Sequence, residues 1–222
     1  MPDIPNRAEL EAELARRFSK LSAAHRRELM NLLGNPPGIG NVPASFWDKV
    51  ASELSGTFVP FLATIYMDAA ERMLPGLPIG VDWGLVNTRA AEWARNYGGT
   101  LVRNITNTTR RAVGESVAAF FERGQTRADL EASLGRLFGP TRAEMIAVTE
   151  VTRAASNGEQ ELAREIAAEG IEMVPVWQTN NDELVCPICG PRHNKPITDG
   201  MFPPAHVRCR CWHGYELPKV ER

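Results

Sequence analysis

Apolar residues recur every three or four positions over most of the first 170 residues of this chain. In residues 1–33 charged residues fill the gaps between them, which predicts one or two amphipathic helices. The stretch 34–43 ends this pattern, because proline and glycine at such density do not continue a helix. Ser45 is then a candidate N-cap for a second helical region, which runs to about Leu74 and is bent or interrupted at Pro60.

A second break rich in proline and glycine occupies residues 75–80, and helical spacing resumes after it. Asp82 can cap a third helix there, because its carboxylate can accept a hydrogen bond from a free N–H of the first turn. The Gly98-Gly99-Thr100 sequence is expected to open a separate, longer helix that runs to about Arg123.

Two more helices are predicted before residue 170. Gly124 ends the long helix, and Thr126 with Asp129 resembles the capping box of a helix over 126–138. Pro140 suits the first position of a last helix, which runs to about residue 168 and is closed by Gly170.

The period of the pattern changes beyond residue 170. Residues 173–179 are rich in β-branched and aromatic side chains with rough alternation, which predicts a strand. Short extended pieces are expected at 195–198 and 211–217. The sequence therefore predicts an α+β protein with a predominantly helical body and a small, β-rich module at the C-terminal end, where four cysteines (Cys186, Cys189, Cys209 and Cys211) predict a zinc staple. The expected parts are a helical N-terminal region (1–97), a second helical part (98–170) and the β-rich module (171–222).

Composition and charge exclude several classes of protein. Hydrophobic residues make up 43% and charged residues 23%, which is typical of a globular chain. The formal net charge of -2 gives no global attraction to nucleic acid or to an anionic membrane. The longest apolar run, 57–67, covers about half a bilayer and contains Pro60, so we expect no transmembrane helix. The first residues lack the basic and apolar segments of a secretion signal.

All four cysteines fall in the β-rich module, between residues 186 and 211. Cys186 and Cys189 form a C-x2-C pair, and a turn-rich loop separates them from His206, Cys209 and Cys211. Two such clusters can complete a tetrahedral site, for which thiolates favour zinc. The three residues Cys186, Cys189 and Cys209 are the firmer ligands, and the fourth is His206 or Cys211. Coordination by protein alone would make the zinc structural.

Two other states of these thiols remain open at this point. Reduced cysteines packed among proline and aromatic residues are one, and disulfides formed after release from the cell are the other. His193 and His213 are weaker candidate ligands.

Four other sets of polar residues have plain structural interpretations. Asp182 is expected to stabilise a turn rather than to act as a catalytic carboxylate. Glu150 and Arg153 lie three apart on a helix and can pair, and they are expected to help dock that helix to the β-rich module. His25 is expected on a solvated face. The arginines of 103–111 form a modest basic edge that we expect to be solvated.

Three features in order resemble the phage Mu F-like family of minor head proteins, also called phage head morphogenesis proteins. They are the helix RAEMIAVTEVTRAASN (142–157), the run WQT with Asp182 and VCPIC (177–189), and the segment PPAHVRCRC (203–211). Together the features cover about residues 98–212. Family members often carry arginine where this chain has Val148 and proline where it has Val207, and neither change removes a candidate ligand. Residues 1–97 carry none of these features.

The resemblance implies a structural, non-catalytic component of a tailed phage or phage-like particle, inside the head and close to the portal. It would be assembled in the host cytoplasm and act in head morphogenesis and in DNA packaging or ejection. The implied partners are the portal protein, the major capsid or scaffold protein and packaged DNA, with no membrane. The amphipathic stripe of residues 8–33 is a candidate docking face.

Two alternative functions remain open from the residues. A zinc-stapled DNA-binding module could use the local basic patch, although acidic neighbours nearly cancel its charge; the patch comprises Arg192, Lys195, Arg208 and Arg210. A metal-dependent hydrolase or effector could place Asp182, His206 and Glu150 around a zinc with an open position.

Overall fold

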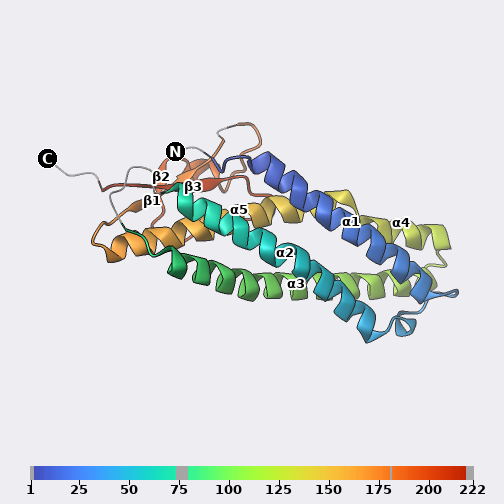
Figure 1. Ribbon diagram of the computed structural model, residues 1–222. Coiled ribbons are helices and arrows are strands. Elements are labelled where there is room, and N and C mark those ends of the chain that lie inside the picture. Colours follow the sequence, from blue (N-terminus) through green and yellow to red (C-terminus); the bar gives the residue numbers. More distant parts are fainter. Residues whose placement is uncertain (1–2, 74–79, 181, 219–222) are drawn as a thin grey trace. The chain divides into compact units, whose positions relative to one another are not determined.

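The computed structural model describes residues 3–73, 80–180 and 182–218 (Figure 1). These residues form mainly helices, followed by a small sheet near the C-terminal end, which confirms the predicted α+β class. The α-helices are α1 (Arg7–Leu33), α2 (Ala44–Arg72), α3 (Trp83–Glu122), α4 (Arg127–Leu137) and α5 (Pro140–Ala168). Two short 3-10 turns are η1 (Ile39–Asn41) and η2 (Gly190–Arg192).

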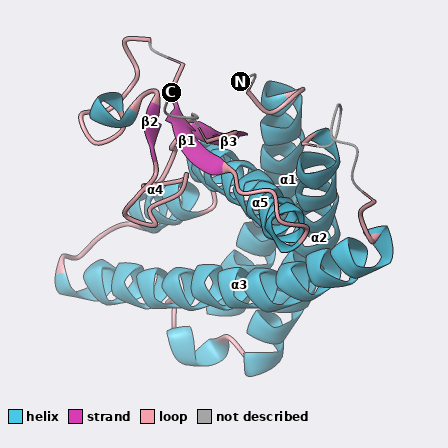
Figure 2. Cartoon of the chain, turned by 90° about the vertical axis from the view of Figure 1, so that its left-hand side faces the viewer, coloured by secondary structure: helices cyan, strands magenta, loops and turns pink. Residues whose placement is uncertain are grey.

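The sheet has three antiparallel strands in the order β2-β1-β3 (Figure 2). They are β1 (Val174–Gln178), β2 (Lys195–Pro196) and β3 (Trp212–Glu216). Val176 in the central strand lies opposite Pro196 of β2 and Gly214 of β3. All three extended segments predicted from the sequence are therefore present.

The chain divides into two compact units. The strand-bearing unit comprises Met1–Glu11, Phe61–Trp93 and Met145–Arg222. The helical unit comprises Ala12–Pro60 and Ala94–Glu144. Each unit is built from segments that are separate in the sequence. The three consecutive parts expected from the sequence remain a prediction.

Local capping signals place several helix ends where the sequence predicts them. Asp82 Oδ1 accepts a hydrogen bond from the N–H of Leu85 (3.1 Å) at the start of α3. Thr126 and Asp129 form the reciprocal capping box of α4. Gly124 and Gly170 follow α3 and α5 with positive φ values of 59° and 85°, which glycine adopts without strain.

The start and the middle of α2 differ from the expectation. The helix begins at Ala44, so Ser45 lies in its first turn and not at the N-cap. The helix is also not interrupted at Pro60, which is accommodated within it. The end predicted at about Leu74 lies outside the described residues.

The prediction that a separate helix opens at Gly98 is wrong. Helix α3 runs unbroken from Trp83 through Gly98 and Gly99 to Glu122. Gly98 packs so closely on α2 that an added Cβ would lie 2.9 Å from Cγ2 of Val59. This glycine therefore serves a close helix contact rather than a helix start.

The expectation for His25 is also wrong. His25 is buried in the helical unit, and its Nε2 lies 2.7 Å from a carboxylate oxygen of Glu53. The neighbouring arginines suggested a solvated face, but a helix turns by about 100° per residue, so adjacent positions face different surroundings.

The apolar stripe of residues 8–33 belongs to the core. Leu14, Phe18, Leu29 and Leu33 are buried, and the Phe18 ring meets Phe58 edge to face at 5.6 Å between centroids. This burial removes the stripe as a free docking face.

By length and composition alone, α2 is apolar enough to cross a membrane, the one such helix in the part of the chain that is described. Its fully buried large residues recur at the spacing of a single helical face: Leu54, Phe58, Leu62 and Ile65. This spacing is typical of a core helix. That no membrane is involved stays a prediction.

Two clusters of buried side chains stabilise the strand-bearing unit. One brings α5 against the neighbouring helices through Ala70, Val86, Leu162 and Ile166. The other lies beside the sheet and contains Trp177, Ile197 and three of the four cysteines. The second cluster provides the surroundings of the candidate metal centre.

Candidate metal centre

Two tight turns present the cysteines and His206. In the first, the N–H groups of Cys189 and Gly190 donate to the carbonyl of Cys186, at 3.1 and 2.9 Å. In the second, the N–H of Cys209 donates to the carbonyl of His206 (3.2 Å). Both turns bring side chains three residues apart to the same side, as metal-binding knuckles require.

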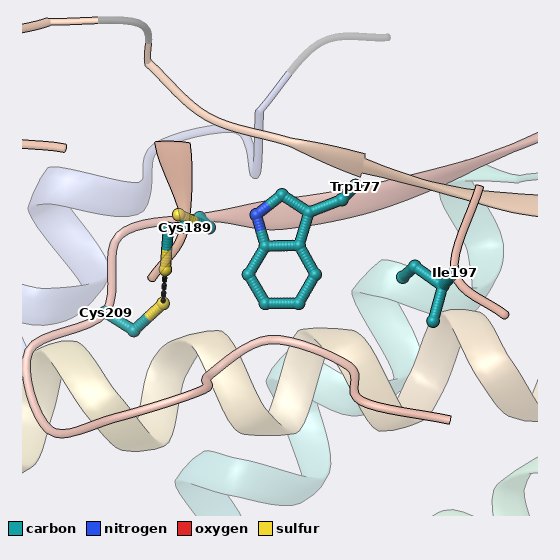
Figure 3. Packing of buried hydrophobic residues seen from close by; sticks show 5 residues of the cluster. Trp177, Cys189, Ile197 and Cys209 are labelled. Carbon is teal, nitrogen blue, oxygen red and sulfur yellow. Dashed lines mark hydrogen bonds between the residues drawn. The ribbon is translucent and has the colours of Figure 1, made fainter. Parts of the chain in front are cut away.

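The turns bring all five candidate ligands together. His206 Nε2 lies 3.1 Å from Cys186 Sγ and 3.4 Å from Cys189 Sγ. Cys189 Sγ lies 3.9 Å from Cys209 Sγ (Figure 3). The residues fall into two groups, Cys186/Cys189/His206 and Cys189/Cys209/Cys211, with ligand atoms within 4.8 Å of one another in each. Cys189 is common to both groups.

The histidine has the tautomer that a metal ligand needs. His206 Nδ1 lies 2.8 Å from the carbonyl oxygen of Val207 and donates its proton there. This leaves the lone pair of Nε2 facing Cys186 and Cys189. The hydrogen bond to Val207, with the charges of Cys209 and Cys186, raises the pKa of His206. Such an outer hydrogen bond is the usual means of orienting a metal-bound histidine.

The thiols differ in how readily they ionise. A hydrogen bond from Cys211 lowers the pKa of Cys209 to about 5, and the same bond raises the pKa of Cys211. Burial raises the pKa of Cys189 to about 12. Burial also opposes ionisation of Cys186, but hydrogen bonds from Cys189 and Ile188 outweigh it and lower the Cys186 pKa. Cys186 and Cys209 therefore offer thiolates most readily.

The surroundings suit a small ion held by thiolates. Cys189, Cys209 and Cys211 are almost fully buried in the cluster that contains Trp177. Figure 3 shows Cys189 and Cys209 beside the Trp177 ring. A hollow of about 30 Å³ is lined by four of the five candidate ligands, Cys186, Cys189, His206 and Cys211. That space exceeds the roughly 10–15 Å³ needed for one water-sized sphere. The residues present could therefore hold a metal ion, and their thiolate-rich chemistry suits zinc.

Helix α5 supports the loop that carries His206 and Cys209. Thr149 Oγ1 accepts a hydrogen bond from the N–H of Arg208 (2.9 Å). Thr152 Oγ1 shares its proton between the carbonyl of Cys209 (3.1 Å) and that of Val148 in its own helix (3.0 Å). Arg208 has a positive φ of 60°, so this side-chain contact holds a backbone conformation that a non-glycine residue rarely adopts.

Arg7, for which the sequence predicts no role, also binds this loop. Its guanidinium donates to the carbonyl of Arg210 (2.7 Å) and to the hydroxyl of Thr152, and the side chain is buried. Thr149 and Thr152 belong to the segment 142–157 that resembles the family, and their spacing of three places them on one side of the helix. No local signal marked Arg7, which is distant from the loop in sequence.

The remaining polar candidates have structural partners. Asp182 Oδ1 accepts from the N–H of Leu184 (3.0 Å), and both carboxylate oxygens bind Arg210, which lowers the pKa of Asp182. The turn-stabilising role predicted for Asp182 is confirmed. Glu150 lies 3.6 Å from Arg153, as predicted for this pair, and Glu150 is buried.

Neither Asp182 nor Glu150 belongs to the ligand groups found among the described residues. His193 Nδ1 instead accepts from the N–H of Thr179 (3.1 Å), and His213 is buried beside Glu159. Of the local basic patch, Arg192 pairs with Asp199 at 2.7 Å, and Arg210 is bound to Asp182. These pairs offset part of the positive charge that a DNA-binding module would need.

Comparison with known proteins links this part of the chain to one family. Residues 111–213 match the family model described as phage Mu protein F like protein. The match confirms the resemblance inferred from the sequence, and it includes all five candidate ligands. No curated protein and no solved structure matches the chain. The phage Mu F-like family is a structural family of head morphogenesis.

Proposed function

We propose that this chain, which resembles the phage Mu F-like proteins over residues 111–213, is a minor head protein of a tailed phage or phage-like particle. It acts without catalysis, in few copies inside the head and near the portal. Its partners are the portal protein and the major capsid or scaffold protein, and it contributes to packaging or ejection of DNA. The observation that carries this proposal is the family match, which extends from the end of α3 to the start of β3.

The Cys/His centre has a structural role in this proposal. Zinc is held by Cys186, Cys189, His206 and Cys209, while the Cys211 thiol donates a hydrogen bond to the sulfur of Cys209. The position of His206 Nε2 beside the sulfurs of Cys186 and Cys189, and of the Cys189 sulfur beside that of Cys209, supports this choice of four. Structural zinc contributes about 10–16 kcal/mol in small peptides, enough to hold a module with so small a sheet.

The experiment that tests the proposed function is genetic. The gene is deleted from the source phage or prophage, and DNA-filled heads and infectious particles are counted with and without complementation. We expect deletion to reduce infectious particles while the amounts of portal and major capsid protein stay unchanged, and the wild-type gene to restore them. An undiminished yield of infectious, DNA-filled particles would contradict the proposal.

A further inference from the structure

The helical unit carries a groove of about 780 Å³ that neither the metal centre nor its supports use. Helix α1 contributes Ser19, Ala23 and Met30 to its lining, which also includes Arg26 and Arg27 between them. Gly135 of α4 and Phe138, the residue that follows α4, line the other side.

Four of the lining residues are small or apolar, and they are called the floor of the groove below: Ala23, Met30, Gly135 and Phe138. Ala23 is exposed, and Met30 and Phe138 are half-buried. Gly135 carries no side chain, and the guanidinium of Arg26 lies over it, 3.7 Å from where a Cβ would be. Ala23, Met30 and Phe138 offer apolar contacts to a second helix.

The rim is positively charged. Three arginines, Arg26, Arg27 and Arg127, line the groove with a single carboxylate, Glu131. Arg26 donates to the carbonyl of Glu131 (3.0 Å), and Arg127 lies 3.4 Å from the Glu131 carboxylate. Arg27 is exposed and has no ion-pair partner among the residues that the structure describes.

We infer that this groove binds an acidic amphipathic helix of another protein. Apolar side chains at positions i, i+3, i+4 and i+7 of that helix would contact Ala23, Met30 and Phe138. Carboxylates beside them would meet Arg27 and Arg127 at the rim, where complementary charge sets specificity and speeds association. A DNA backbone fits less well, because phosphates gain nothing from the apolar residues of the floor.

The inference goes beyond the proposed function and does not depend on it, since it concerns a surface outside the metal centre.

The test uses the purified full chain and a fluorescein-labelled model helix of about 20 residues, which is long enough to be helical. The model helix carries leucine at the four anchor positions and glutamate around them. Fluorescence anisotropy measures binding to the wild type and to the double variant Arg27→Glu/Arg127→Glu. The matched control is Arg110→Glu/Arg111→Glu, which changes the charge equally on α3 of the same unit. Ala23→Trp fills the floor without changing charge.

The model helix is expected to bind the wild type and the α3 control equally. Arg27→Glu/Arg127→Glu should weaken binding about ten-fold, with a similar loss for Ala23→Trp. Arg27, Arg127 and Ala23 are exposed, so the variants should keep the circular dichroism of the wild type. Equal binding of a lysine-rich helix with the same leucines would overturn the inference. So would a short DNA duplex that binds more tightly than the acidic helix and loses binding in Arg27→Glu/Arg127→Glu.

Discussion

The hydroxyl of Thr152, in the middle of α5, lies 3.1 Å from the carbonyl oxygen of Cys209 and 3.0 Å from that of Val148, and it shares its one proton between them. This contact joins the longest helix of the strand-bearing unit to the loop that carries a candidate metal ligand. Arg7 binds the same hydroxyl and, through the carbonyl of Arg210, the same loop. The metal centre is therefore positioned by α1 and α5 as well as by its own turns.

Replacing Thr152 by valine should destabilise this connection. The change keeps the shape of the side chain but removes the hydroxyl that the buried carbonyl of Cys209 and one nitrogen of Arg7 bind, at a cost of about 1–3 kcal/mol. We expect a lower midpoint of urea unfolding and weaker metal binding. The control is Thr108→Val on exposed α3 surface, which should change neither. Equal midpoints for both variants would show that the contact does not support the loop.

Metal content should separate the two choices of fourth ligand. Cys186→Ser, Cys189→Ser, Cys209→Ser and His206→Ala each remove a proposed ligand and should abolish stoichiometric zinc, measured by mass spectrometry of the purified protein. Cys211→Ser removes only a hydrogen bond to a ligand and should keep one zinc, with affinity lowered about 10–100-fold. Loss of zinc in Cys211→Ser with retention in His206→Ala would instead indicate four cysteines. Wild-type protein purified without metal would contradict the site altogether.

Two glycines in helices should respond oppositely to alanine. A Cβ at Gly158 in α5 would overlap the carbonyl oxygen of Tyr66 and lie 2.8 Å from its carbonyl carbon, whereas at Gly114 in α3 it would meet nothing within 4 Å. Gly158→Ala should therefore destabilise by about 3 kcal/mol or more, because the helix must shift. Gly114→Ala should stabilise by about 0.5–1 kcal/mol through helix propensity. Thermal unfolding measures both, and a stable Gly158→Ala protein would refute the close packing of α5.

The buried carboxyl of Glu159 should make stability depend on pH. Burial raises the pKa of Glu159 to about 8, and Arg72, at 3.9 Å, offsets only part of this effect. Burial also lowers the pKa of the neighbouring His213 to about 3, so that ring stays neutral between pH 5 and 9. The folded chain then holds a proton on Glu159 that the unfolded chain releases above its ordinary pKa of 4.5. The stability from this group is fully present below pH 4.5 and is lost as pH rises through 8.

Glu159→Gln removes this titration. Relative to the wild type, its free energy of unfolding should rise from pH 5 to pH 8 by up to about 1.4 kcal/mol per pH unit. Urea unfolding of both proteins at several pH values measures the difference, from which any pH dependence of the metal centre cancels. Glu115→Gln, at an exposed position, is the control and should show no such trend. A constant difference between Glu159→Gln and wild type would mean that Glu159 is ionised in the folded protein.

Local features of the sequence predicted more than distant ones. The capping box of Thr126 and Asp129 and the C-x2-C pair depend on residues within one turn of each other, so their spacing was sufficient evidence. Gly98 and His25 were misjudged because their surroundings come from α2, through Val59 and Glu53. The residues next to Gly98 and His25 in the sequence do not indicate these contacts, because the contacts depend on how the helices pack.

The number of copies of this chain per particle tests most directly whether the chain is a minor component of a phage head. DNA-filled particles from the source system are purified, and the chain is quantified against the portal protein by mass spectrometry. We expect a few copies per particle, and their loss from particles assembled without the portal protein. Absence of the chain from mature, DNA-filled particles that contain the portal protein would contradict the account.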